Sequence, residues 1–146
     1  MQSTKPQTAA VGLTDSPAGL AAWLIEKLRA WSDRRPDGTS LLDRDAMLTD
    51  VTIYWLTGTI GSSMRMYRAN EAIPATERSR TIGVPTGYTL FPADIEPPAP
   101  DAWLERTTTD LVYVSRPTRA GHFAPIEDPE LYARELREFF RPYRMT

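Results

Sequence analysis

The sequence predicts an α/β fold. Apolar residues recur at spacings of three and four over much of residues 17–67, which is typical of amphipathic helices. Two short β-rich runs follow, at residues 84–91 and 111–115, with a helical turn between them. Two strands joined by a helical crossover are typical of a parallel pair, but two strands alone do not make a stable sheet. We therefore expect the edge of a larger parallel sheet.

The first helix is expected to begin at Pro17. Residues 1–15 contain Pro6 and Gly12 and show no sustained period, so we expect them to be extended or looped. Ser16 can cap the helix, and proline suits its first turn. The apolar face of this helix comprises Leu20, Trp23, Leu24, Leu28 and Trp31. The pattern stops in the polar stretch 33–38, which contains both proline and glycine.

A second helical region is expected from about Asp43, and Asp15, Asp43 and Asp128 all have the character of caps. Its apolar stripe comprises Ala46, Met47, Val51, Tyr54, Trp55, Ile60, Met64 and Tyr67. Tyr54 and Trp55 are expected to lie in the core. Gly58 and Gly61 fall within the stripe and argue against one unbroken helix.

The last part of the chain alternates strand and helix signals. The run 111–115 has the length of a buried strand, and a proline-dense loop at 92–100 precedes a helical turn at 101–106. A loop is expected over 116–127. The final helix should be capped by Asp128 and begin with Pro129, with an inward face comprising Leu131, Leu136, Phe139 and Phe140.

Composition excludes several classes of function. The chain has 146 residues, 41% of them apolar, which fits one globular domain. It has no cysteine and one histidine, so disulfide frameworks, thiolate sites and multi-histidine metal sites are excluded. The net charge of −2 and the scattered arginines give no reason to expect nucleic-acid binding. No segment approaches the ~20 apolar residues of a membrane span, and the first residues do not resemble a signal peptide. We expect a soluble cytoplasmic domain.

His122 and Asp94 are the main candidates for chemistry. Each follows directly on a predicted strand, where open α/β sheets place their sites. Neighbouring parallel strands would bring the two exit loops together, so the carboxylate could orient the imidazole. A surface-loop histidine and a turn aspartate beside a proline are the plain alternatives, and the spacing alone leaves both open.

Tyr67 is a weaker candidate, because a tyrosine on a helical stripe is more often a packing residue than a proton donor. No nucleophile is evident. Residues 61–63 do not form a glycine–x–serine–x–glycine elbow, and residues 58–61 are too short for a phosphate loop. A histidine and an acid without a nucleophile make an incomplete active site.

Four segments of the chain resemble a known family. Residues 15–23 (DSPAGLAAW), 53–63 (IYWLTGTIGSS), 84–87 (VPTG) and 121–124 (GHFA) are similar to the C-terminal portion of microsomal-type epoxide hydrolases, which have the α/β-hydrolase fold. The resemblance implies that residues 1–80 are a helical cap-type segment with the helices that follow it. Residues 81–146 would then hold the last strands, the acid and histidine loops and the terminal helix.

The resemblance also implies a mechanism. In this family an aspartate opens the epoxide to form a hydroxyalkyl-enzyme ester, and a histidine paired with a carboxylate activates the water that hydrolyses the ester. Carried over by motif, His122 is the base, Asp94 its orienting acid, and Tyr67 one of two donors to the epoxide oxygen. The substrate would be a small-molecule epoxide, with water as the second reactant and no metal or cofactor.

The family's nucleophile and oxyanion motifs do not occur in these 146 residues, and neither does its second tyrosine. We therefore expect a C-terminal piece of an epoxide hydrolase that is inactive by itself. One alternative is a non-catalytic or complementing module that associates with a separately encoded N-terminal half. A binding domain with accidental similarity is the third possibility.

Overall fold

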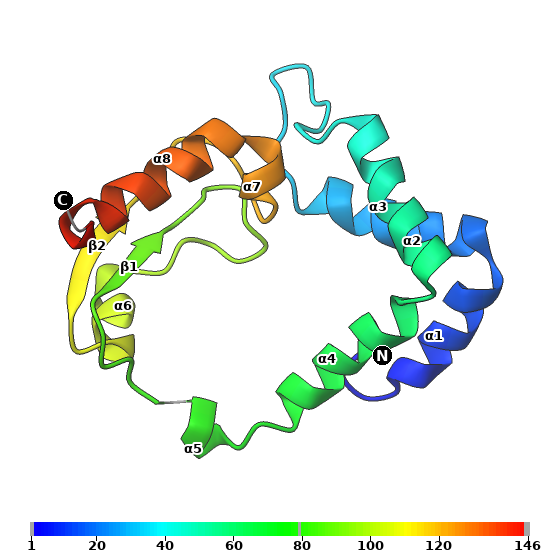
Figure 1. The fold of residues 1–146 in the computed structure, drawn as a ribbon, viewed down its shortest axis with the longest axis horizontal. Coiled ribbons are helices and arrows are strands. Elements are labelled where there is room, and N and C mark those ends of the chain that lie inside the picture. Colours follow the sequence, from blue (N-terminus) through cyan, green and yellow to red (C-terminus); the bar gives the residue numbers. More distant parts are fainter. Residues whose placement is uncertain (1, 79, 145–146) are drawn as a thin grey trace. The chain divides into compact units, whose positions relative to one another are not determined.

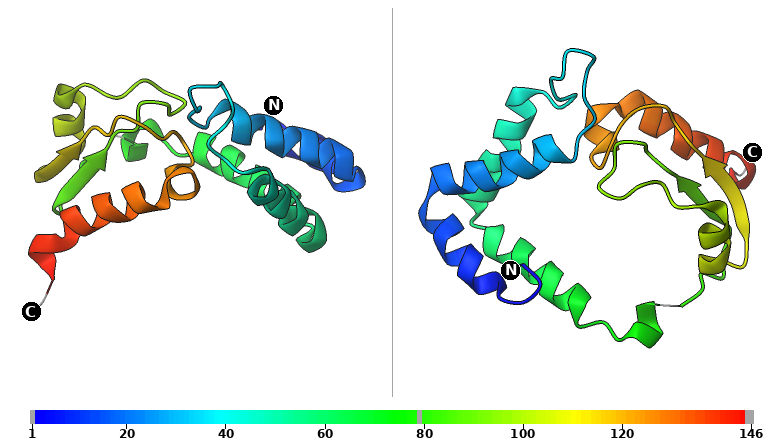
Figure 2. Two further views of the ribbon diagram at one scale, coloured as in Figure 1. Left: turned by 90° about the horizontal axis from the view of Figure 1, so that it is seen from above. Right: turned by 180° about the vertical axis from the view of Figure 1, so that it is seen from behind.

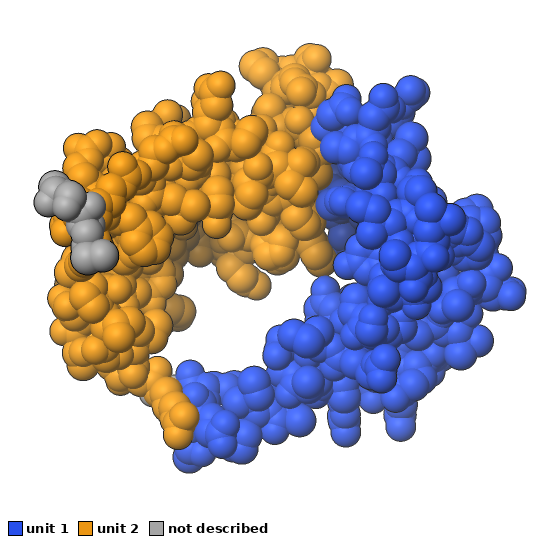
Figure 3. Space-filling view, viewed as in Figure 1, with its two compact units in different colours: residues 1–30, 43–78 blue, residues 31–42, 79–146 orange. Residues whose placement is uncertain are grey.

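The computed structural model describes residues 2–78 and 80–144. The chain forms two compact units (Figure 3): a helical unit of residues 1–30 and 43–78, and a strand-containing unit of residues 31–42 and 79–146. Both units are therefore discontinuous in sequence. The expected division at residue 80, into cap-type and hydrolase parts, stays a prediction.

The described residues of the helical unit form five helices (Figure 1), which are α1 (Pro6–Asp15), α2 (Pro17–Ala30), α3 (Arg44–Thr57), α4 (Ile60–Glu71) and α5 (Ala75–Arg78). Helix α1 packs along α4, and α2 packs along α3. The expectation of an extended segment over residues 1–15 is wrong. Pro6 occupies the first turn of α1, where proline is tolerated, and Ala9 and Leu13 pack against the unit's core.

Most of the predicted helix signals in this unit are confirmed. The Ser16 hydroxyl accepts a hydrogen bond from Gly19 N at 3.0 Å, and the Asp43 carboxylate accepts from the first turn of α3. Gly58, with φ of 62°, ends α3 in the left-handed conformation, so the long stripe is divided into two helices. Asp15 is not a cap, because it is the last residue of α1.

The core of the helical unit forms around Leu20, Ile60 and Met64. Tyr54 packs against this cluster, as expected. Trp55 does not, and is exposed. Successive residues of a helix are about 100° apart, so Tyr54 and Trp55 cannot both face the same narrow cluster.

The strand-containing unit holds β1 (Thr86–Thr89), α6 (Asp101–Thr107), β2 (Leu111–Ser115), α7 (Ala124–Glu127), α8 (Pro129–Phe140) and η1 (Arg141–Tyr143). The strands pair in parallel, which confirms the predicted crossover through α6. Helices α6 and α8 lie on opposite faces of the strand pair (Figure 2). The mixed α/β architecture is the predicted one.

Helix α8 packs closely on the sheet at Gly87. Gly87 pairs with Tyr113, and a Cβ at Gly87 would lie 2.5 Å from the ring of Phe139. The predicted Asp128 cap is confirmed by a 3.0 Å bond from Leu131 N to its carboxylate. Leu131 is buried, but Leu136 and Phe140 are exposed, so only part of the predicted inward face is covered.

The expectation of a buried second strand is wrong for this chain. Residues of β2 alternate between half-buried and exposed, and the side chains of Val112 and Val114 are 46% and 39% exposed. Successive strand residues point to opposite faces of a sheet, so one face of β2 is only partly covered. Among the helices of residues 2–78 and 80–144, none combines the length and apolar character that a bilayer crossing requires.

Candidate active site

The loops that follow the two strands come together just beyond the carboxyl ends of β1 and β2. Ala93 and Gly121 form an isolated parallel bridge, and Ala93 N donates to Ala120 O at 3.2 Å. A Cβ at Gly121 would lie 2.7 Å from both Ala93 O and Trp31 O. Three backbone segments therefore meet at a position that only glycine fits. The next residue after each bridged residue is a predicted site residue, Asp94 or His122.

His122 and Asp94 form a hydrogen-bonded pair. His122 Nδ1 lies 2.8 Å from Asp94 Oδ1, and each side chain is 42% exposed. An ionised carboxylate only accepts hydrogen bonds, so Nδ1 carries the proton when Asp94 is ionised. The lone pair of the neutral ring is then on Nε2. This is the arrangement that a general base requires.

Two aromatic rings contact the imidazole. The Trp31 ring meets it edge-on, with centroids 5.5 Å apart, and the Phe123 ring does so at 5.1 Å. The backbone of His122 is also fixed, because its N–H donates to Trp31 O at 2.9 Å. Trp31, expected on the face of the first helix, thus lies one residue beyond α2 and contacts the histidine.

Two carboxylates that the sequence did not single out bind the histidine loop. Glu127 accepts hydrogen bonds from Gly121 N, Phe123 N and Asp33 N at 2.8–3.0 Å. Asp33 accepts from Ala120 N at 2.9 Å. The sequence offers one signal for Glu127, which is an acidic residue directly before the Asp128 cap and five residues after His122.

Tyr67 lies in the other unit, on α4. Its side chain is 43% exposed and lines a shallow depression of about 420 Å³, together with Asn70 and Arg78. The Arg78 side chain donates to the backbone oxygens of Asn70, Glu71 and Ile73, which fixes the C-terminal end of α4. The structure therefore pairs two of the three predicted site residues and puts the third in a separate unit.

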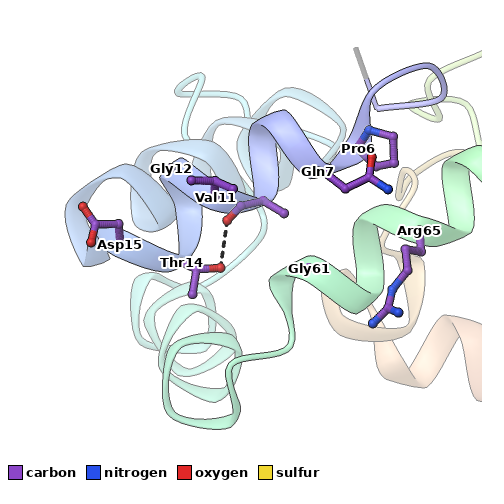
Figure 4. A pocket seen from close by; sticks show the side chains of 9 residues that line it. Pro6, Gln7, Val11, Gly12, Thr14, Asp15, Gly61 and Arg65 are labelled. Atoms are coloured by element: carbon purple, nitrogen blue, oxygen red, sulfur yellow. Dashed lines mark hydrogen bonds between the residues drawn. The ribbon is translucent and has the colours of Figure 1, made fainter.

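A second hollow lies along α1 (Figure 4). It encloses about 710 Å³ and is lined by α1 side chains together with Gly61 and Arg65 of α4. Asp15 and Arg65 are its charged lining residues and lie at opposite ends, and the Thr14 hydroxyl bonds to Ala10 O within its own helix. No histidine lines it, so it has no imidazole base. Among the described residues, no group of three or more potential ligands is placed to hold a metal ion.

Comparison with known proteins gives consistent relatives. The chain is 42% identical over 144 residues to a provisionally named epoxide hydrolase of Stigmatella aurantiaca, which covers 99% of this chain and 32% of that protein. It is 39% identical over 150 residues to epoxide hydrolase 1 of Sus scrofa, covering 95% and 32%. The juvenile hormone epoxide hydrolase of Bombyx mori superposes with a TM-score of 0.82 at 30% identity, covering 98% of this chain and 36% of that structure. No protein-family model matches the chain.

These matches identify the fold as a segment of an α/β hydrolase, with two parallel strands and their flanking helices. The chain is homologous to epoxide hydrolases over about a third of their length. The resemblance in the sequence is thereby confirmed.

Proposed function

We propose that the chain is the C-terminal part of an epoxide hydrolase, in which His122 activates water to release a vicinal diol. The observation that carries the proposal is the 2.8 Å hydrogen bond between His122 and Asp94 in a chain homologous to such enzymes. Tyr67 is proposed as one of the two donors to the epoxide oxygen. The cytoplasmic location expected from the sequence belongs to the same proposal.

The proposed chemistry has two steps. An aspartate from the remainder of the enzyme attacks one epoxide carbon, the carbon–oxygen bond breaks, and the oxygen takes a proton from tyrosine. His122 Nε2 then removes a proton from water as the water oxygen attacks the ester carbonyl. Collapse of that intermediate breaks the ester bond between the carbonyl carbon and the product oxygen and leaves a carboxylic acid. The two protons of the water, one on His122 and one on this acid, pass to the leaving alkoxide and to the tyrosinate, which releases the diol and restores the carboxylate and the tyrosine. The Asp94 carboxylate accepts the hydrogen bond from His122 Nδ1–H throughout.

A hybrid enzyme tests this function. Residues 2–144 would replace the matching segment of the silkworm juvenile hormone epoxide hydrolase, and diol formation from juvenile hormone would be measured. We expect His122→Ala in the hybrid to stop turnover after one equivalent of ester has formed, which the intact protein mass would reveal. Turnover by H122A at the rate of the unmodified hybrid would disprove the proposed role.

The second candidate is a non-catalytic module that binds a separate N-terminal half. The exposed β2 side chains Val112 and Val114 favour it, because they form an apolar strand face with little cover in this chain. Co-expression with the remaining two thirds of a relative distinguishes the candidates. A module would co-purify without producing diol, whereas a catalytic part would restore diol formation that depends on His122.

A further inference from the structure

We propose that Glu127, together with Asp33, is a positioning residue that holds the His122 loop in register with Asp94. The inference rests on the proposed function, since positioning matters to catalysis only if His122 is the base. The proposal is argued from the hydrogen-bond acceptors around the loop. Each of the four consecutive N–H groups from Ala120 to Phe123 has a specific partner.

Glu127 uses both of its oxygens for this purpose. Oε2 accepts from Gly121 N at 3.0 Å and from Asp33 N at 2.8 Å, and Oε1 accepts from Phe123 N at 2.9 Å. Gly121 and Phe123 are the two neighbours of His122. One carboxylate therefore fixes the peptide groups on both sides of the histidine and ties them to the segment 31–42.

Asp33 and Trp31 supply the other two acceptors. Asp33 Oδ2 accepts from Ala120 N at 2.9 Å, and Trp31 O accepts from His122 N at 2.9 Å. Ala120 has φ of 76°, which is unfavourable for a residue with a Cβ, yet it is fully buried. Strained backbone persists where the surroundings over-determine it, and the carboxylate partners of this loop do so.

The arrangement requires a carboxylate rather than any polar side chain. Glutamine in place of Glu127 would keep the length and shape of the side chain but would present an NH2 group to at least one backbone N–H. Two donors would then face each other, and the loop would lose an acceptor. Glu127→Gln therefore tests the positioning of the loop without changing the size of the side chain that packs in α7. Glu130 is an exposed acid in the first turn of α8, so Glu130→Gln removes the same charge as a matched control.

The single histidine of the chain allows a direct test. In the 146-residue protein with ¹⁵N-labelled histidine, the ring nitrogen shifts report whether Nδ1 carries the proton. We expect the Nδ1–H form in the wild type and in E130Q, and a mixture of tautomers in E127Q, D33N and D94N. Wild-type shifts in a folded E127Q would overturn the proposal. If E127Q loses the wild-type circular dichroism, D33N decides by the same criterion.

The hybrid enzyme provides a kinetic test of the same proposal. We expect E127Q to slow ester hydrolysis roughly 10²-fold, the effect of a displacement of about 1 Å, with ester formation and kcat/KM unchanged. If H122A does not impair the hybrid, the proposed function fails, whatever E127Q does. If H122A stops turnover while E127Q hydrolyses ester as fast as E130Q, only the positioning role fails.

Discussion

At the scale of single residues, Asp94 reaches His122 because both follow a bridged pair, Ala93 and Gly121. Side chains at matching positions of parallel strands project in the same direction, so the acid and the imidazole leave the backbone together. Pro92, three residues beyond the end of β1, has no N–H to donate to the neighbouring strand, and the chain turns there. The pair is therefore a consequence of strand register.

We expect Asp94→Ala to lower turnover of the hybrid enzyme by roughly 10²-fold or more, because the imidazole loses its orientation and its fixed tautomer. Ester hydrolysis, followed in a single turnover, is the step that should slow. Glu96→Gln changes an exposed acid two residues further along the same loop and serves as the control. Equal rates for D94A and E96Q would contradict the expectation.

Tyr67→Phe should affect the opposite half-reaction. Loss of one hydrogen-bond donor to the developing oxyanion costs on the order of 10²-fold, so ester formation in the hybrid should slow while ester hydrolysis is unchanged. Tyr54→Phe, in the core of the same unit, is the matched control. Slower ester hydrolysis with normal ester formation would reverse the assignment of Tyr67.

At the scale of elements, the contact between β1 and α8 depends on glycine at position 87, which has no side chain. A Cβ at Gly87 would lie 2.5 Å from Phe139, whereas one at Gly83 has no neighbour within 4 Å. We expect Gly87→Ala to destabilise the chain by about 1–3 kcal/mol through overpacking, while Gly83→Ala leaves stability nearly unchanged. Urea unfolding followed by circular dichroism measures both. Equal midpoints for the two variants would contradict the packing described for α8.

The same helix is also held by a hydrogen bond that depends on pH. The Tyr113 hydroxyl donates to Glu135 Oε2 at 2.8 Å, and burial, followed by this bond, raises the pKa of Tyr113 above its usual value of 10.0. Because the pKa of Tyr113 is higher in the folded than in the unfolded chain, this bond stabilises the fold fully at pH values below the pKa of the unfolded chain. The contribution is lost as the pH rises through the pKa of the folded chain.

We therefore expect Tyr113→Phe to lower the free energy of unfolding by about 1 kcal/mol at pH 8. The difference between wild type and Y113F should shrink above pH 10, where the tyrosine of the unfolded wild type ionises, and should be lost as the pH rises through the raised pKa of the folded chain. Urea unfolding of both proteins across this range provides the measurement. A difference that is independent of pH would show that the hydrogen bond contributes little.

The elements that sequence patterns predicted well are those with local signals. The start of α2 at Pro17, the bounds of β2 and the Asp128 cap of α8 follow from residues adjacent in the chain. Helix α1 was missed because its ten residues are largely small or polar and show no clear period. Glu127 was missed because its partners are backbone groups, one of them 94 residues away, which leave no pattern in the side chains.

At the scale of the whole molecule, much apolar surface is exposed in both units. Val11, Leu56, Trp103 and Phe140 are among the exposed side chains, and the chain spans about a third of the length of its relatives. Exposed apolar surface of this extent favours association. We expect the isolated chain to self-associate as its concentration rises, which sedimentation velocity would detect. A monomer at all concentrations, with one cooperative thermal transition, would contradict this.

The isolated chain is also expected to form no diol from an epoxide. Activation of water is useless without an ester to hydrolyse, and the family's nucleophile motif does not occur among these 146 residues. Incubation with an aryl epoxide and chromatographic detection of the diol checks this. Diol formation that His122→Ala abolishes would contradict it.

The hydrogen bonds from the segment 31–42 to the histidine loop have a consequence for the order of folding. They join residues 87 and 94 positions apart in sequence, and closing such long loops costs entropy before any contact is made. Contacts of this range form slowly compared with helices. During synthesis on the ribosome, the partners of Asp33 are added only 87 and 94 residues after Asp33 itself. The site is thus expected to mature late, and a chain that stops before Glu127 cannot complete it.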